Sequence, residues 1–268
     1  MKKKIIKILF LGDIVGRRAR NLIIEETKNL RKEFDCDFVI ANCENAAGGF
    51  GVTPSICEEL FKSGIDVLTS GNHIWDKPEI SSFINKEKHL LRPFNMLREY
   101  PGKGFTVIKN DEGIRLGVIN IMTNLFMQKN DNLFSSIDIV LEKMKLLKDV
   151  DLSLIDVHGE ATSEKIAFGH YVDGRVSAVV GTHTHVPTSD HRVLPCGTAY
   201  QTDVGMCGDY NSVIGMEKKA SLSKFLGKKN IKFSVAKGEP TICGSLVEIN
   251  KSSGLATNIH PIKKYGYI

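Results

Sequence analysis

Two histidines one residue apart carry the densest chemistry in this chain. His183 and His185 follow directly after the apolar run 176–180, in the order Gly-Thr-His-Thr-His. In extended backbone, residues i and i+2 point to the same side, so both imidazoles could be directed at one place just beyond a strand end. Imidazole is the commonest neutral metal ligand in proteins. An isolated pair of this kind is more often two solvated polar residues, so its meaning depends on the rest of the chain.

Ligand-type side chains occupy the same kind of position elsewhere, just after a short apolar segment. They are Asp13 after residues 5–11, Glu44 and Asn45 after 38–41, Asn72 and His73 after 67–69, and His158 after 152–157. In open α/β folds, loops from separate strands converge at the strand ends, and this is where sites form. With the histidine pair, five segments therefore contribute oxygen or nitrogen donors to one predicted site.

The donor types of this set predict two divalent ions. Imidazole, carboxylate and amide donors without a thiolate favour iron or manganese, and zinc also suits them. One carboxylate can bridge two ions about 3.5–4 Å apart, and such a pair activates water and holds a phosphoryl group. Taken alone, each residue has an ordinary alternative, such as a helix-capping role for Asp13 or a place in the core for His158. The joint pattern favours the metal site.

Strands and helices must alternate to place these side chains, and the hydrophobic pattern predicts that they do. The predicted strands cover residues 5–11, 38–41, 67–69, 105–108, 115–119, 152–157, 176–180, 231–236, 242–249 and 257–262. The predicted helices cover residues 17–34, 54–63, 77–86, 133–148, 160–170 and 217–227. Asp76 suits the N-cap of the helix over 77–86, with Glu79 completing a capping box. We expect an α/β fold of two sheets and outer helices, in one domain spanning 1–268.

Composition excludes several classes of protein. Of the 268 residues, 42% are hydrophobic, which is enough to bury a sizeable core. A formal net charge of +5 demands neither nucleic acid nor a membrane as partner, although it would attract anionic substrates. No segment approaches the roughly 20 apolar residues of a membrane span. Six cysteines without a C-x-x-C pair, and no secretion signal at the N-terminus, predict reduced thiols in a cytoplasmic protein.

The order of the motifs resembles a known family. Gly12-Asp13, Gly71-Asn72-His73, a lone His158 and the stretch 181–185 follow the signature of the calcineurin-like metallophosphoesterases. The usual D-x-H is here Asp13-Ile14-Val15, and Glu44-Asn45 stands where an aspartate is usual. These departures resemble the YmdB-like subgroup of bacterial cyclic-nucleotide phosphodiesterases, as do the stretches 160–165, 173–175 and 197–206. The likeness runs from about residue 5 to beyond residue 250.

This resemblance implies a four-layer α/β/β/α sandwich, a dinuclear metal centre and hydrolysis of 2′,3′-cyclic nucleotides or other phosphodiesters by a metal-bridging hydroxide. The residue roles that it implies are Asp13 and His185 on the first metal, Glu44 as the bridge, Asn72, His158 and His183 on the second metal, and Asn45 near the first. His73 would assist the leaving oxygen. His183 and His185 would then bind different metals.

Some functions and roles stay open at this point. A phosphomonoesterase or nucleotidase would use the same metal core, and a regulatory protein could hold a nucleotide with little turnover. A small phosphodiester is the expected partner, without a membrane; a homo-oligomer is possible and RNA is not excluded. Glu160 and Glu164 could orient ligand histidines or begin a helix, and Arg175 could hold a phosphate or form a structural ion pair. Asp203 has no assigned role.

Overall fold

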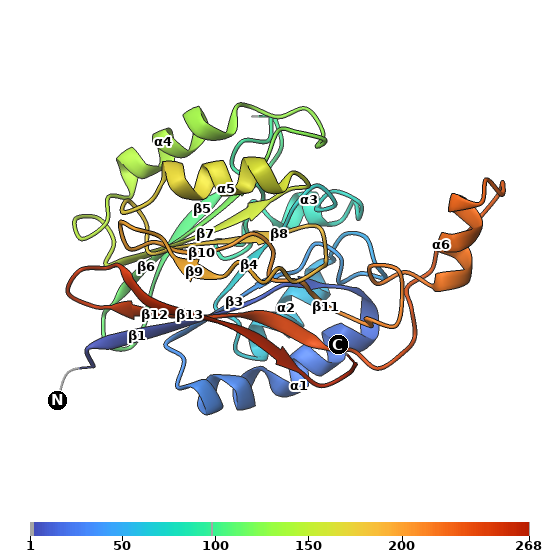
Figure 1. Ribbon diagram of the computed structural model, residues 1–268, viewed down its shortest axis with the longest axis horizontal. Helices are drawn as coiled ribbons and strands as arrows, with labels where there is room; N and C mark the ends of the chain where they lie inside the picture. The colour runs from blue at the N-terminus through green and yellow to red at the C-terminus, as the bar shows by residue number, and fades with distance from the viewer. Residues whose placement is uncertain (1–2, 98, 268) are drawn as a thin grey trace.

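Two mixed β-sheets packed face to face form the centre of the structure, a computed structural model that describes residues 3–97 and 99–267 (Figure 1). The five-stranded sheet has the order β13 (Ala256–Lys264), β12 (Ile242–Asn250), β1 (Ile5–Leu11), β3 (Phe38–Asn42) and β4 (Val67–Thr69). The six-stranded sheet has the order β5 (Phe105–Lys109), β6 (Arg115–Met122), β7 (Leu152–His158), β8 (Ala178–Thr182), β10 (Ala199–Gln201) and β9 (Arg192–Val193). A small third sheet pairs β2 (Asp13–Ile14) with β11 (Met206–Cys207).

Side-chain alternation along the strands explains why the sheets stack. Successive residues of a strand point to opposite faces. Ile6, Ile8 and Phe10 of β1 are fully buried in the core between the sheets, whereas Leu9 and Leu11 belong to a second core on the outer face. A strand that is apolar on both faces must be covered on both sides.

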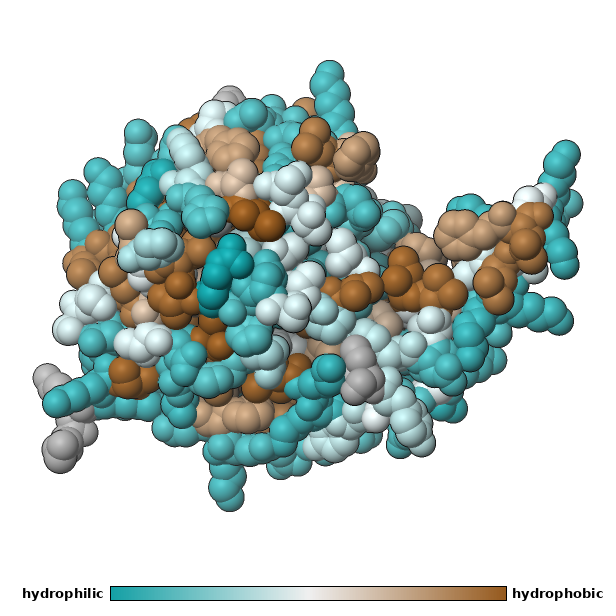
Figure 2. Space-filling model, viewed as in Figure 1, coloured by the Kyte–Doolittle hydropathy of each residue, from teal (hydrophilic) through white to brown (hydrophobic). Residues whose placement is uncertain are grey.

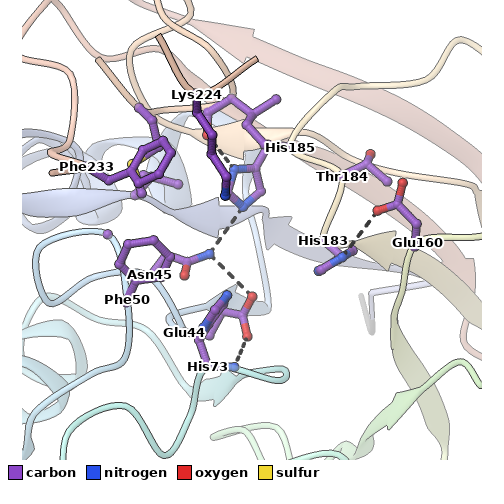
Figure 3. Close-up of a pocket in the computed structure, with 14 residues that line it drawn as sticks. Glu44, Asn45, Phe50, His73, Glu160, His183, Thr184, His185, Lys224 and Phe233 are labelled. Carbon is purple, nitrogen blue, oxygen red and sulfur yellow. Dashed lines mark hydrogen bonds and ion pairs between the residues drawn. The ribbon is translucent and has the colours of Figure 1, made fainter. Parts of the chain in front are cut away.

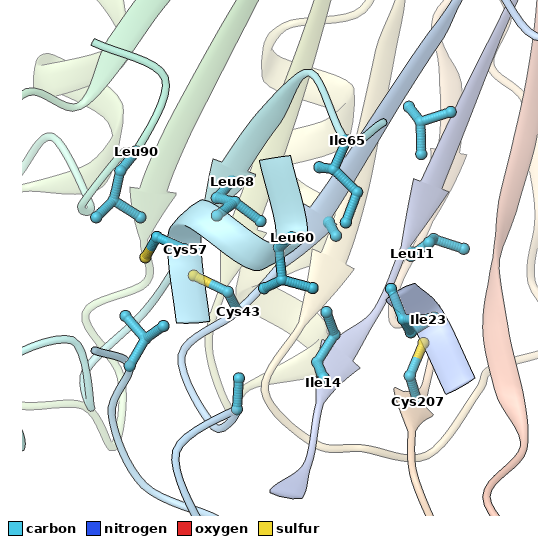
Figure 4. Close-up of a cluster of buried hydrophobic side chains, with 14 of the residues drawn as sticks. Leu11, Ile14, Ile23, Cys43, Cys57, Leu60, Ile65, Leu68, Leu90 and Cys207 are labelled. Atoms are coloured by element: carbon cyan, nitrogen blue, oxygen red, sulfur yellow. The ribbon is translucent and has the colours of Figure 1, made fainter. Parts of the chain in front are cut away.

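Helices cover both outer faces of the paired sheets. On the five-stranded sheet lie α1 (Gly16–Phe34) and α2 (Pro54–Lys62), and their apolar side chains form the cluster shown in Figure 4. On the six-stranded sheet lie α4 (Leu133–Lys143) and α5 (Thr162–Tyr171) (Figure 1). The remaining helices are the short α3 (Ile80–Phe83) and α6 (Lys218–Phe225). The expected four-layer α/β/β/α sandwich is confirmed.

The predicted helix over residues 77–86 is wrong in length and in its cap. Only Ile80–Phe83 are helical, and Glu79 rather than Asp76 is the N-cap. The Asp76 carboxylate instead bonds the His73 ring, at 2.8 Å from Oδ2 to Nδ1. Because the Asp76 carboxylate is bonded to His73, it is not free to cap a helix.

The predicted strand over residues 231–236 is also wrong. Only Val235 of this stretch makes a β-bridge, an isolated one with Met216. This stretch belongs to the arm that carries α6 (Figure 1). Its backbone bonds to residues 215–217 instead of to a sheet, since Glu217 N–H donates to Ser234 O and Ala236 N–H donates to Gly215 O. The predicted hairpin of β5 and β6 is confirmed, and the strand predicted over 176–180 is shifted to Ala178–Thr182.

Two further expectations concern the chain as a whole. All six cysteines are free thiols, five of them buried and Cys196 exposed. Among residues 3–97 and 99–267, no helix combines the length and the apolar character that a membrane crossing requires.

Candidate metal centre

The ligand-type side chains meet where several strands end. The strands β3, β4, β7 and β8 run parallel to their neighbours, so the loops that follow them gather at one edge of the two sheets. A cavity of about 530 Å³ opens there. Predicted site residues that line it are Glu44, Asn45, His73, His183 and His185, several of which are drawn in Figure 3.

Three electron-rich atoms converge on one ring nitrogen of His158. Its Nε2 lies 3.0 Å from Asn72 Oδ1, 3.1 Å from Glu44 Oε1 and 3.1 Å from His183 Nδ1. Glu44, His158 and His183 also form a group whose ligand atoms lie within 4.8 Å of one another. A neutral imidazole whose other nitrogen carries the hydrogen would face these atoms with a lone pair. Such a set of donors fits a cation.

A buried relay holds the His158 ring in this orientation. His158 Nδ1 lies 2.9 Å from Thr182 Oγ1, which donates to Asp156 Oδ1 at 2.7 Å. Asp156 Oδ2 also accepts from Asn42 Nδ2 at 3.1 Å and from Thr69 Oγ1 at 2.5 Å. Burial raises the pKa of Asp156 to about 7. The relay keeps hydrogen on Nδ1 and leaves Nε2 free to bind.

Sequence reasoning missed Asp156, although a signal existed. A carboxylate in the apolar strand 152–157 is unusual, and it stands two residues before His158. Residues i and i+2 of a strand share a face, so this carboxylate had to lie beside the histidine.

We predict that Asp156→Asn weakens metal binding at the His158 site by about 10–100-fold, because the amide disturbs the hydrogen bonds that orient the ring. Titration of manganese into metal-free protein measures the change. The matched control is Asp138→Asn, on a half-exposed carboxylate that pairs with Arg175 away from the cavity. Equal affinity in Asp156→Asn and in the control would contradict the orienting role.

A second group of donors lies beside the first. His185 Nδ1 donates to the Ile214 carbonyl at 2.8 Å, and His185 Nε2 lies 3.2 Å from Asn45 Nδ2. Asp13 Oδ2 accepts the His183 backbone N–H at 3.1 Å. The buried atoms Asp13 Oδ1 and Asn45 Oδ1 have no hydrogen-bond partner among the described residues. A second cation would satisfy these orphaned buried oxygens, which lie beside an imidazole nitrogen that carries no hydrogen.

Glu44 joins the two groups. Its Oε1 lies 3.1 Å from His158 Nε2 and accepts from Asn45 Nδ2 at 3.3 Å, while Oε2 accepts the His73 backbone N–H at 3.0 Å. A Cβ on Gly71 would clash with both His158 Nε2 and Glu44 Oε2, so the glycine before Asn72 is needed to bring these side chains together. Glu44 therefore stands between the two donor groups.

The electrostatics show that the centre of the donor cluster stabilises a positive charge. Burial opposes ionisation of Glu44, but the neighbouring His158 holds the pKa of this carboxyl at about 2. Burial likewise opposes the charge on His158, yet Glu44 and Asp13 raise its pKa to about 9. Burial and the charge on His158 lower the pKa of His183 to about 3. Without an ion, the proton on His158 supplies the charge that a metal would bring, and metal binding would release it.

His73 approaches the cavity from a different side. Its Nδ1 is held by Asp76, and its ring meets Phe50 edge-on with centroids 5.0 Å apart. Its Nε2 has no hydrogen-bond partner in the described part of the chain. The ring lines the cavity without joining the donor cluster (Figure 3).

The loop that holds the two histidines of residues 181–185 is strained and directs their rings differently. His183 and His185 have φ values of 101° and 65°. Positive φ costs a non-glycine residue about 1–3 kcal/mol, so the surroundings must enforce it. The buried Lys165 does this: its Nζ donates to Thr182 O at 2.6 Å and to Asp203 Oδ2 at 3.1 Å. Asp203, which sequence reasoning left unassigned, accepts the Thr184 backbone N–H at 3.0 Å from the other side.

Lys165→Met is expected to destabilise the protein by about 3–5 kcal/mol, because it leaves the buried Asp203 carboxylate without its cation. Urea unfolding of metal-free protein measures this loss. Lys109→Met removes an exposed ammonium group and should change the free energy of unfolding by less than about 0.5 kcal/mol. Indistinguishable unfolding midpoints for the two variants would show that the ion pair does not hold the loop.

The structure distinguishes the alternative roles that the sequence left open for Glu160, Glu164 and Arg175. Glu160 Oε2 lies 3.3 Å from His183 Nε2, so it orients a ligand-type histidine. Glu164 instead accepts the backbone N–H groups of residues 124 and 125 and ties down that loop. Arg175 pairs with Asp138 at 2.7 Å, the structural ion pair rather than a phosphate contact.

A sandwich of this kind, with acidic, amide and imidazole side chains at the strand ends, is the architecture of metallophosphoesterase-type phosphatases. The chain belongs to the YmdB-like protein family, whose family model matches residues 9–262. The family resemblance seen in the motifs is thus confirmed, as is the expectation of a phosphoric-ester hydrolase.

Individual relatives agree with this membership. The chain is 43% identical to a Bacillus subtilis protein named 2′,3′-cyclic-nucleotide 2′-phosphodiesterase, over 96% of each chain. A crystal structure of a hypothetical protein from Thermus thermophilus matches 98% of this chain and 100% of that one, with a TM-score of 0.90 and 37% identity. A structure described as a novel phosphatase from Mycoplasma pneumoniae matches 99% and 95%, with a TM-score of 0.90 and 33% identity.

Proposed function

We propose that this protein is a phosphodiesterase that uses two divalent metal ions to hydrolyse 2′,3′-cyclic nucleotides. Asp13 and His185, with Asn45 nearby, would hold one ion, and Asn72, His158 and His183 the other. Glu44 would bridge them. Iron or manganese suits the donors best, and zinc is compatible with them. When bound, the ions would supply an activated water and neutralise charge on the phosphoryl oxygens.

The convergence on His158 carries this proposal. Glu44 Oε1 and Asn72 Oδ1 both lie within 3.1 Å of His158 Nε2. A protein rarely buries so many acceptors together without a compensating positive charge. The unpartnered Asp13 Oδ1 and Asn45 Oδ1 support a second ion at the other end of Glu44.

The substrate's leaving oxygen would face His73. Hydrolysis adds the oxygen of water to phosphorus, breaks the bond from phosphorus to the ribose 2′ oxygen and places a proton on that oxygen. His73 can supply the proton from Nε2, because Asp76 holds the ring by Nδ1. The apolar wall of Val15, Phe50, Met216 and Phe233 offers a surface for the base. The product would be a nucleoside 3′-phosphate.

A phosphomonoesterase is the second candidate, favoured by the Mycoplasma pneumoniae relative described as a phosphatase. Assays of manganese-loaded protein with 2′,3′-cyclic AMP, 3′,5′-cyclic AMP and p-nitrophenyl phosphate separate the two. We expect the 2′,3′-cyclic nucleotide to give the highest kcat/KM. A higher kcat/KM for the monoester would show that the protein is a phosphomonoesterase instead. If metal-loaded protein hydrolyses none of the esters, both enzyme functions are wrong, and a nucleotide-sensing role remains.

A further inference from the structure

An arm stands out from the sandwich beside the cavity. It carries α6 and the segment that follows it, and it projects well beyond the two sheets (Figure 1). Figure 2 shows hydrophilic and apolar groups next to one another on this arm. None of its side chains is needed to build the metal centre, so its composition calls for a separate explanation.

The arm concentrates the positive charge of the protein. Residues 218–237 contain seven lysines and no acidic residue, whereas the whole chain has a net charge of only +5. All seven lysines are exposed, and none forms a salt bridge with a carboxylate in the described part of the chain. Unpaired like charges on one short segment repel each other, so a polyanionic partner would stabilise them.

Large apolar side chains are exposed among these lysines. Leu222, Phe225 and Leu226 have exposed fractions of 56%, 83% and 74%. Single-stranded nucleic acids bind where lysines contact the phosphates and aromatic rings stack with the bases. The exposed ring of Phe225 and the half-buried ring of Phe233 offer such stacking surfaces between the lysines.

The arm is continuous with the cavity. Lys224 and Phe233 both line it, and Lys224 Nζ lies 5.0 Å from the centre of the Phe233 ring. Figure 3 shows these two side chains on the same side of the cavity as His185. A ligand that enters the cavity on this side therefore passes along α6.

We propose that the arm binds single-stranded RNA and presents its 2′,3′-cyclic phosphate end to the metal centre. The terminal nucleotide would occupy the cavity near Phe233, and the preceding phosphates would follow Lys224 and the lysines at 228, 229 and 232. The reaction adds one water to the ring phosphate, breaks its bond to the 2′ oxygen and leaves a terminal 3′-phosphate. This inference rests on the proposed phosphodiesterase function and names its substrate class.

A membrane surface fits the arm less well. Helices that lie on bilayers separate their apolar and cationic residues to opposite faces. In α6 the two kinds are poorly separated, since Lys224 directly precedes Phe225 and the helix has only eight residues. Membrane binding also would not explain why Lys224 and Phe233 of the arm line the cavity.

The test compares two substrates. Wild-type protein should hydrolyse an oligonucleotide of about ten residues ending in a 2′,3′-cyclic phosphate with at least about tenfold higher kcat/KM than 2′,3′-cyclic AMP. With about four lysine–phosphate contacts, oligonucleotide binding should fall about fiftyfold between about 50 and about 200 mM salt. A triple variant, Lys228→Ala, Lys229→Ala and Lys232→Ala, should lose the advantage of the oligonucleotide and keep its activity on the mononucleotide.

The control removes the same charge elsewhere, by alanine substitution of the exposed Lys143, Lys145 and Lys148. It should retain the preference for the oligonucleotide. Equal kcat/KM of wild-type protein for both substrates, or an unchanged preference in the arm variant, would overturn the proposal.

Binding is measured separately by fluorescence anisotropy, with an oligonucleotide that ends in a 3′-phosphate. If wild-type protein hydrolyses neither substrate, the proposed function fails, and weaker oligonucleotide binding by the arm variant still supports the RNA site. Three results would reassign the arm: binding to phosphatidylglycerol vesicles without RNA binding, loss of self-association in the arm variant with unchanged RNA binding, or RNA binding equal in the arm and control variants.

Discussion

Glu44→Gln is expected to lower kcat/KM for 2′,3′-cyclic AMP by about three orders of magnitude. The substitution keeps the shape of the side chain and removes its negative charge from between the two donor groups. A metal ion supplies several kcal/mol of transition-state stabilisation, and each 1.36 kcal/mol is worth about tenfold in rate. One oxygen would become an N–H₂ group facing either His158 Nε2 or the His73 backbone N–H, which disfavours a cation there.

The effect is measured as steady-state kinetics together with metal content by elemental analysis. We expect Glu44→Gln to lose at least one ion per chain, whereas Glu58→Gln, on an exposed carboxylate of α2, should lose neither metal nor activity. Full metal content with low activity would mean that Glu44 serves the reaction without holding an ion. Full activity would remove Glu44 from the centre altogether.

The convergence of this site was predictable because strands of one sheet end together. Asp13, Glu44, Asn72 and His158 each follow an apolar segment, and the register of parallel strands brings such positions to one edge. The positions of these residues after apolar segments therefore predict which side chains meet at the site. The family motifs added the assignment of donors to two ions, which spacing alone leaves open.

Interactions between distant segments could not be predicted in the same way. Lys165 and Asp203 are 38 residues apart and meet only after α5 packs on the six-stranded sheet. A lysine within a predicted helix suggests a solvated face, yet Lys165 is fully buried. Its role depends on the carbonyl of Thr182 and on a loop whose path no local pattern specifies.

Two predictions of secondary structure from local sequence patterns were wrong, one for a helix cap and one for a strand. Asp76 and Glu79 have the spacing of a capping box, but the contact with His73 takes the Asp76 carboxylate. Residues 231–236 alternate like a strand, but they extend along the arm rather than beside a sheet. Both errors lie next to the cavity, where substrate contacts rather than local stability would select the residue types.

His73→Ala is expected to reduce the rate according to the leaving group. Proton donation contributes about 10²–10⁴-fold when the leaving oxygen is a poor one, such as the ribose 2′ oxygen. A p-nitrophenolate leaves without a proton, so bis(p-nitrophenyl) phosphate should be hydrolysed by the variant within a few fold of the wild-type rate. The contrast between the two substrates distinguishes a proton donor from a residue that holds metal, because loss of an ion would slow both reactions.

Two controls complete this test. His191→Ala removes an exposed imidazole that does not line the cavity and should leave both substrates unaffected. Asp76→Asn keeps the His73 ring but weakens its 2.8 Å bond at Nδ1, so it should slow the cyclic nucleotide by a smaller factor than His73→Ala. Equal losses on both substrates in His73→Ala would show that this histidine acts on the metal centre instead of the leaving oxygen. Its position argues otherwise, because the ring contacts Phe50 and Asp76 and leaves Glu44 to be reached by the backbone alone.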